Sequence, residues 1–134
     1  MMQFYFLSVL INCVVGISLL FINAKDEKYK FFDFTKNPRF KLITGILACI
    51  ISLITLCGSY EGSWPFLGDL IPSLTGLWGG FTLLYSFYLD KRTLEAEQKE
   101  RKFDSFLTDN SKYFGVTCLV AALFHFLFPK VIIL

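Results

Sequence analysis

Four stretches of this 134-residue chain carry no charged side chain, and they limit what it can fold into. A helix of about 20 apolar residues covers the roughly 30 Å of hydrocarbon in a bilayer. Helices also satisfy their own backbone polar groups, as lipid requires. The pattern predicts an all-α integral membrane four-helix bundle forming one transmembrane domain over residues 1–134. The expected spans are about 2–23, 42–60, 70–89 and 113–133.

The charged residues are segregated between these stretches. Of the 24 charged residues (13 basic, 11 acidic), nine lie in segment 24–41 and twelve in segment 90–112. A water-soluble helical protein with four buried helices is the alternative. It would need more amphipathic surface helix than a chain of 15.4 kDa has left.

Lys and Arg set the expected orientation. Six lie in segment 24–41 and six in segment 90–112, whereas the N-terminus and the 61–69 connection have none. The positive-inside rule places both basic segments in the cytoplasm and both termini outside, in the cell inner membrane. The net charge of +2 follows from these segments. We therefore expect a lipid bilayer as partner and no nucleic acid.

The second half of the chain resembles the first. Residues 35–56 match residues 108–129 at a shift of 73, and residues 16–21 match residues 80–85 at a shift of 64. Tandem duplication would give hairpin repeats 1–60 and 68–134, related by an axis along the membrane normal as in parallel repeats. Chance similarity between apolar segments is the alternative.

Local signals predict how the cytoplasmic segments are built. Asn37-Pro38 reads as an N-cap with proline at the first helical position, and Asn110 offers a similar cap to the last helix. The first and third helices are expected to continue beyond the bilayer, the third through segment 93–107. Aromatic residues among lysines in segment 24–41 suit the headgroup layer or a partner-binding surface.

Small residues recur along every expected span. Close approach of backbones drives helix association in lipid, and small residues permit it. We expect these lines to face the bundle axis, with the large apolar side chains turned to lipid. The predicted packing residues are Gly16, Gly45, Cys49, Ser52, Gly76, Gly80, Cys118 and Ala122.

Two polar side chains are expected at membrane depth. Asn12 is expected to link helices by a hydrogen bond, and His125 to be neutral and hydrogen-bonded to a neighbour. A proton relay through His125 is the alternative, because histidine changes charge near neutral pH. In the outer connection, Trp64 suits an interfacial aromatic belt and Asp69 a helix cap. Alternatively, Glu61 and Asp69 form an acidic mouth that selects cations or meets a partner.

The sequence contains no C-x-x-C pair, and its four cysteines all fall within apolar stretches. We expect no catalytic, cofactor or metal site. The leading hypothesis is a non-enzymatic multi-pass protein, a structural or accessory subunit of a larger membrane complex, with a protein partner or self-association. The alternative is a small homo-oligomeric transporter or channel, and a membrane enzyme ranks third.

Overall fold

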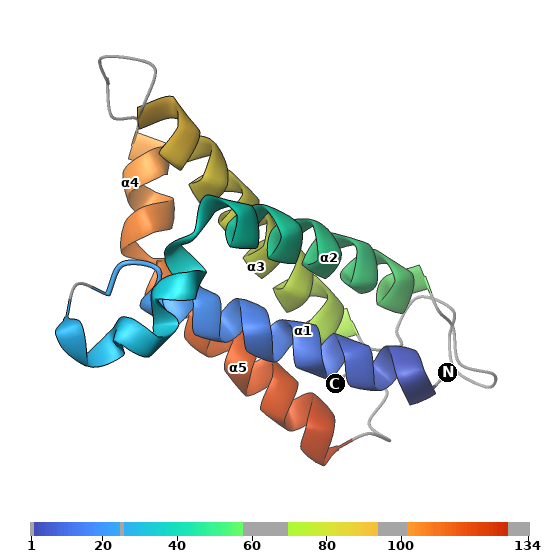
Figure 1. The fold of residues 1–134 in the computed structure, drawn as a ribbon. Helices are drawn as coiled ribbons and strands as arrows, with labels where there is room; N and C mark the ends of the chain where they lie inside the picture. Colours follow the sequence, from blue (N-terminus) through green and yellow to red (C-terminus); the bar gives the residue numbers. More distant parts are fainter. Residues whose placement is uncertain (1, 25, 58–69, 94–101, 129–134) are drawn as a thin grey trace.

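The computed structural model describes residues 2–24, 26–57, 70–93 and 102–128, and within them it confirms an all-α fold. The elements run in the order α1, η1, α2, α3, α4 and α5 (Figure 1). Their bounds are α1 Met2–Phe21, the 3-10 helix η1 Glu27–Lys36, α2 Pro38–Cys57, α3 Leu70–Thr93, α4 Lys102–Asp109 and α5 Ser111–Leu127. The described residues contain no β-strand.

Length and apolar composition mark one of the described helices as able to cross a bilayer. This is α2, with 20 residues and a mean hydropathy of 2.3. Tyr5–Phe21 of α1 and Ser111–Leu127 of α5 form shorter apolar helices. The 24-residue α3 ends in a turn that contains Lys91 and Arg92. The prediction of four spans is therefore met by one described helix on these two criteria.

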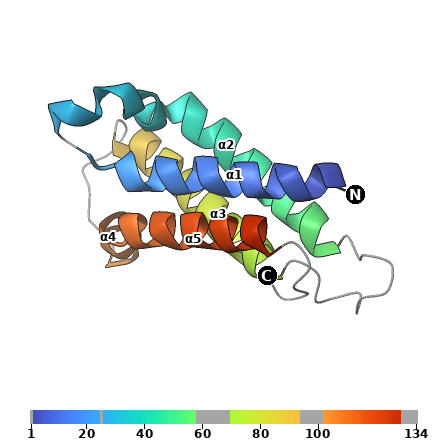
Figure 2. The same ribbon diagram turned by 90° about the horizontal axis from the view of Figure 1, so that it is seen from below.

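The four long helices form a bundle in which α1 packs mainly against α5, and α2 mainly against α3 (Figures 1 and 2). In both pairs the helices are antiparallel. The end of α1, the start of α2, the end of α3 and the start of α5 lie together at one end, beside η1 and α4. We call this the basic end, because the described Lys and Arg residues all belong to the segments gathered there.

Glycines set the closest helix contacts, and these contacts occur twice. A Cβ on Gly16 would lie 2.9 Å from the Gly115 carbonyl oxygen, and one on Gly115 would lie 2.7 Å from the Gly16 carbonyl oxygen. Gly45 and Gly80 have the same reciprocal relation at 3.0 Å. The contact between α1 and α5 thus corresponds to the contact between α3 and α2, with α1 equivalent to α3 and α5 equivalent to α2. The helix contacts therefore follow a pseudo-twofold pattern.

The repeated contacts match at shifts of 64 residues for α1 and α3 and 70 residues for α2 and α5. The first shift equals the one predicted from the sequence. The second is three residues short of the predicted 73, which is nearly one helical turn and so keeps the same face. Tandem duplication as the origin of this pattern stays a prediction.

The helix ends confirm one capping prediction and contradict another. The Asn37 side-chain oxygen accepts a hydrogen bond from the Arg39 N–H at 3.0 Å, which caps α2. Asn110 makes no such cap; its backbone is not extended, and its amide donates to the Phe106 carbonyl at 2.8 Å. The cap prediction was wrong because α4 runs directly into this residue and supplies the partner.

Continuation beyond the apolar stretches was predicted for the first and third helices. For α3 it holds only as far as Thr93, because Lys102–Asp109 form the separate helix α4, whose Asp104 contacts α3, and α1 stops at Phe21. The chain turns there because η1 folds back, and Phe32 stacks on Phe21 with ring centroids 4.2 Å apart.

Candidate functional site

Asn12 is the central polar residue of the bundle. It is buried on α1, and its side-chain amide donates to the carbonyl oxygens of Ser8, at 3.0 Å, and Pro72, at 3.1 Å. The Thr75 hydroxyl reaches the Asn12 side-chain oxygen at 3.4 Å. Asn12 thus ties α1 to the first turns of α3, the type of link expected for it.

Ser52 and Gly76 meet Asn12 at the same point. Gly76 leaves room for both neighbours, because a Cβ there would overlap the Ser52 oxygen and lie 3.2 Å from the Asn12 side-chain oxygen. The hydroxyl groups of Ser52 and Ser73 have no hydrogen-bond partner within the described residues. The structure therefore brings Asn12, Ser52 and Gly76 together from α1, α2 and α3.

His125 lies apart from this cluster. It is buried on α5 with its ring centroid 4.4 Å from that of Tyr5, whose hydroxyl donates to the His125 backbone carbonyl. Tyr5 and Asn12 are seven residues apart on α1, which corresponds to about 10 Å along the helix. Asn12 and His125, the two polar residues predicted at membrane depth, therefore lie in different parts of the helix packing.

The remaining predicted residues are placed as follows. Gly16, Gly45, Gly80, Cys118 and Ala122 are buried, and Cys49 is half-buried. The Cys118 thiol donates to the Thr75 carbonyl at 3.3 Å, and all four cysteines are free thiols. Glu61, Trp64 and Asp69 lie outside the described residues, as does most of the expected helix in segment 93–107.

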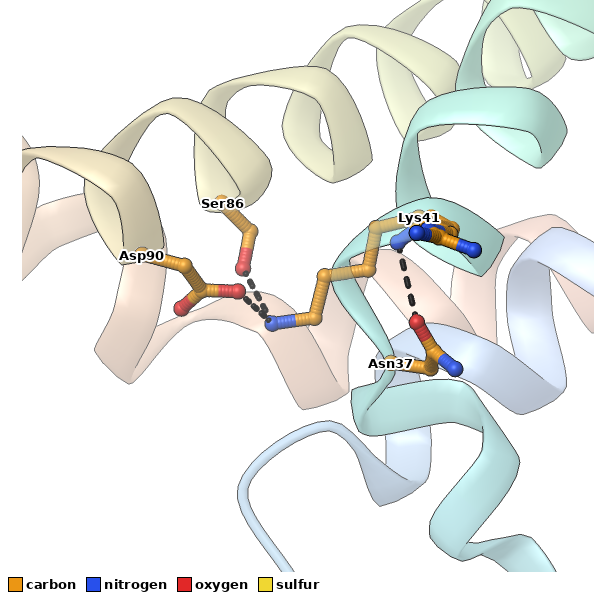
Figure 3. Close-up of polar contacts among 5 residues, drawn as sticks. Asn37, Lys41, Ser86 and Asp90 are labelled. Carbon is orange, nitrogen blue, oxygen red and sulfur yellow. Dashed lines mark hydrogen bonds and ion pairs between the residues drawn. The ribbon is translucent and has the colours of Figure 1, made fainter.

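An ion pair at the basic end, in which only the lysine is buried, was not predicted (Figure 3). Lys41 extends from α2 to α3, where its ammonium donates to Asp90 at 2.5 Å and to Ser86 at 3.3 Å. Its side chain is 6% exposed, against 39% for Asp90. A sequence signal existed, because Lys41 and Asp90 directly border two apolar stretches that antiparallel helices place side by side.

Asp104 makes a second set of contacts at this end. It accepts hydrogen bonds from the Tyr85 hydroxyl and from the Arg92 guanidinium, the latter at 3.3 Å, and so fixes α4 to α3. The Asn23 amide donates to the Thr108 carbonyl at 2.9 Å and reaches the Ser111 hydroxyl at 3.2 Å. These bonds connect the end of α1 to α4 and α5.

A small cavity of about 20 Å³ lies among these groups. Its polar lining includes Asn23, Thr82, Tyr85, Ser86 and Ser111. A cavity of this volume with mixed polar and apolar walls has room for one water molecule but for no organic substrate. Within the described residues, no group of three His, Cys, Asp or Glu side chains could hold a metal ion.

Comparisons with known proteins give a family. A family model without a functional description matches residues 1–125. The chain belongs to this uncharacterised family. An uncharacterized protein of Treponema pallidum (strain Nichols) is 28% identical over 134 residues, covering the full length of both chains. No solved structure matches.

The match to this relative covers the whole chain, including the segments at the basic end, but the relative's description indicates no activity. What the described polar groups do must therefore be judged from their contacts. Asn12, Lys41 and Asp104 each join two helices. As arranged, they hold the bundle together rather than converge on a space where a substrate could bind.

Proposed function

We propose that the chain is a multi-pass protein of the cell inner membrane in which α1, α2, α3 and α5 each cross the bilayer. One observation carries this proposal: large apolar side chains cover the outside, while the interior holds polar side chains among apolar ones. Ile43 is 58% exposed and Leu123 57%, whereas Asn12, Ser52 and His125 are buried. Water disfavours an exterior with so many large apolar side chains, and lipid accommodates it.

The outward apolar surface extends over all four helices. Many of its side chains are about half exposed, and a contiguous apolar surface of that extent is unusual for a monomer in water. Its members on the four helices include Phe6, Leu10, Ile43, Ile46, Leu47, Ile50, Leu53, Ile54, Leu74, Trp78, Phe81, Val116, Val120, Leu123 and Phe126.

Interior hydroxyl groups are bonded in a way that suits lipid. Ser18, Thr55 and Thr82 each donate to the carbonyl four residues earlier in the same helix. Such bonds satisfy a hydroxyl without water. The lengths are also adequate, because α5 with 17 residues extends about 26 Å and α3 with 24 residues about 36 Å. A short span is accommodated by local thinning of the bilayer.

The charges support an orientation. The described basic residues gather at the end that holds η1 and α4, so the positive-inside rule puts this end in the cytoplasm and the start of α1 outside. Labelling of single cysteines in a cysteine-free variant tests this orientation. Lys28→Cys and Lys102→Cys should react from the cytoplasmic side alone, and reaction from the periplasmic side would contradict it.

For the role of the bundle, we propose a non-enzymatic structural or accessory subunit of a larger membrane complex. The support is that the central polar residues serve contacts between helices, which gives a rigid scaffold with an apolar exterior free to pack against another protein. Purification in mild detergent should recover a second, different protein at fixed stoichiometry. Recovery of the chain alone, with no second protein in several detergents, would contradict this role.

A homo-oligomeric transporter or channel is the second candidate. The polar cluster of Asn12, Ser52 and Thr75 favours it, because polar groups at membrane depth often line solute paths. The glycine contacts leave little space inside one chain, so the helices around Asn12 would have to part when copies assemble for such a path to open. Native mass spectrometry and solute flux in liposomes test it, and Asn12→Ala should change the flux if the candidate is correct.

A further inference from the structure

The 3-10 helix η1 offers three different sides. A 3-10 helix has three residues per turn, so residues three apart in sequence lie on one side. η1 covers Glu27–Lys36 and has a kink at Tyr29, where φ is −105° and ψ is 20°. Beyond the kink, each side can be followed through the contacts of its residues.

One side attaches η1 to the bundle. It contains Tyr29, Phe32 and Thr35. The rings of Tyr29 and Phe32 lie 5.0 and 4.2 Å from that of Phe21 at the end of α1. Thr35 is fully buried and donates to the Phe32 carbonyl at 2.8 Å. These contacts fix which way the other two sides face.

A second side consists of charged residues that pair with one another. Lys30 lies 3.8 Å from Glu27, and Lys36 lies 2.9 Å from Asp33. All four side chains are exposed. This side therefore suits water and needs no further partner.

The third side combines a cation with two exposed aromatic rings. It contains Lys28, Phe31 and Phe34, and Phe31 is 83% exposed, the highest value among the large hydrophobic side chains described. Phe34 touches the Phe40 ring edge-on at 5.0 Å but is still about half exposed. The bundle and the charged side therefore leave most of the Phe31 ring and about half of the Phe34 ring uncovered.

We propose that this third side inserts into the cytoplasmic leaflet at the boundary between headgroups and acyl chains, with Lys28 beside anionic lipid phosphates. The proposal rests on the membrane location proposed above. Charge complementarity favours lipid: segment 24–41 contains six basic and three acidic residues, and two of the acidic ones are paired along η1. Aromatic rings with adjacent lysines are typical of segments that lie in this layer.

The test uses the full-length chain with one tryptophan added at Phe31, reconstituted into phosphatidylcholine vesicles with or without phosphatidylglycerol. Wild-type emission is subtracted to remove the two native tryptophans. Phe31→Trp should show a blue-shifted difference spectrum, and lipids brominated near the headgroup should quench it more than lipids brominated deep in the chain. The position is exposed and its ring meets Phe32 edge-on at 5.4 Å, so the substitution alters that contact but leaves the stacking of Phe32 on Phe21 in place.

Asp33→Trp is the matched control, because it adds the same residue on the charged side of the same helix. It should be quenched by aqueous iodide and little by brominated lipid. Phosphatidylglycerol should increase lipid quenching of Phe31→Trp, and adding Lys28→Gln should abolish that increase.

Equal iodide quenching of the Phe31→Trp and Asp33→Trp proteins would overturn the proposal and would indicate a surface in water that meets a protein. Incorporation is measured separately, as resistance of the chain to extraction from vesicles by alkali. Incorporated chain with an iodide-accessible tryptophan would refute this inference alone. Extractable chain would refute the membrane location itself.

Discussion

The close contact between α1 and α5 predicts a specific loss of stability in Gly115→Ala. A Cβ at this position would lie 2.7 Å from the Gly16 carbonyl oxygen and 2.9 Å from the Leu20 backbone nitrogen. Both neighbours are backbone atoms, so relief requires the two helices to move apart. Inserting a methyl group into a tight interior typically costs about 1–3 kcal/mol. Replacing a helical glycine by alanine returns at most about 1 kcal/mol.

The net expectation for Gly115→Ala is a loss of about 1–2 kcal/mol, a factor of roughly 5–30 in the ratio of folded to unfolded protein. Gly45→Ala should cost less, because its nearest neighbour is the Leu84 side chain at 2.8 Å, which can rotate. Val116→Ala is the control: it follows Gly115 on the exposed side of α5 and should change stability by less than about 0.5 kcal/mol.

Reversible unfolding of reconstituted protein by SDS, followed by far-ultraviolet circular dichroism, measures these differences. The order of loss should be Gly115→Ala, then Gly45→Ala, then Val116→Ala. If Gly115→Ala were as stable as the wild type, the backbone contact between α1 and α5 would be refuted. If Val116→Ala cost as much as Gly115→Ala, the exposed and buried sides of α5 would be wrongly assigned.

Two further predictions concern polar links between helices. Asn12→Leu should destabilise the bundle by about 0.6–1.7 kcal/mol in the same unfolding experiment, because it removes the hydrogen bond from α1 to the Pro72 carbonyl; no change would mean that this bond contributes nothing. Lys41→Met should destabilise more than the double variant Lys41→Met with Asp90→Asn, because the single change removes the cation that the Asp90 carboxylate faces. Equal losses in the single and double variants would show that the Asp90 charge costs nothing once Lys41 is removed, and would contradict this reasoning.

Helix content could be predicted from the sequence because the uncharged stretches are long. Helix ends could be predicted only where a local signal exists. The Asn37-Pro38 signal gives the start of α2 at Pro38, as the structure has it, but no pattern within α2 indicates that Lys41 is buried there. Lys41 is accommodated there because α3 presents Asp90 and Ser86 to its ammonium. That partner depends on which helices are neighbours, and periodicity within one helix contains no such information.

The candidate polar residues show the same limit. Asn12 could be chosen from the sequence, because an amide within an apolar stretch needs a partner. Its partner, the Pro72 carbonyl, could not be chosen from the sequence, because every residue has a backbone carbonyl and only the packing of the helices decides which one lies near Asn12. His125 was grouped with Asn12 on polarity alone. The structure separates them because the antiparallel α5 brings His125 to Tyr5, near the start of α1.

The pseudo-twofold pattern separates what the two halves share from what they do not. Glycine contacts recur in both helix pairs, so they answer a packing requirement common to both. At the same equivalences, Asn12 corresponds to Gly76, Ser52 to Ala122, Thr55 to His125 and Lys41 to Ser111. Polar character is thus distributed differently over the two halves although the backbone contacts repeat. Packing alone would allow the same residue at both positions of an equivalent pair, so variants that test packing are best made at both positions and compared. Variants that test function are best made where the two halves carry different residues, beginning with Asn12 and its neighbour Ser52.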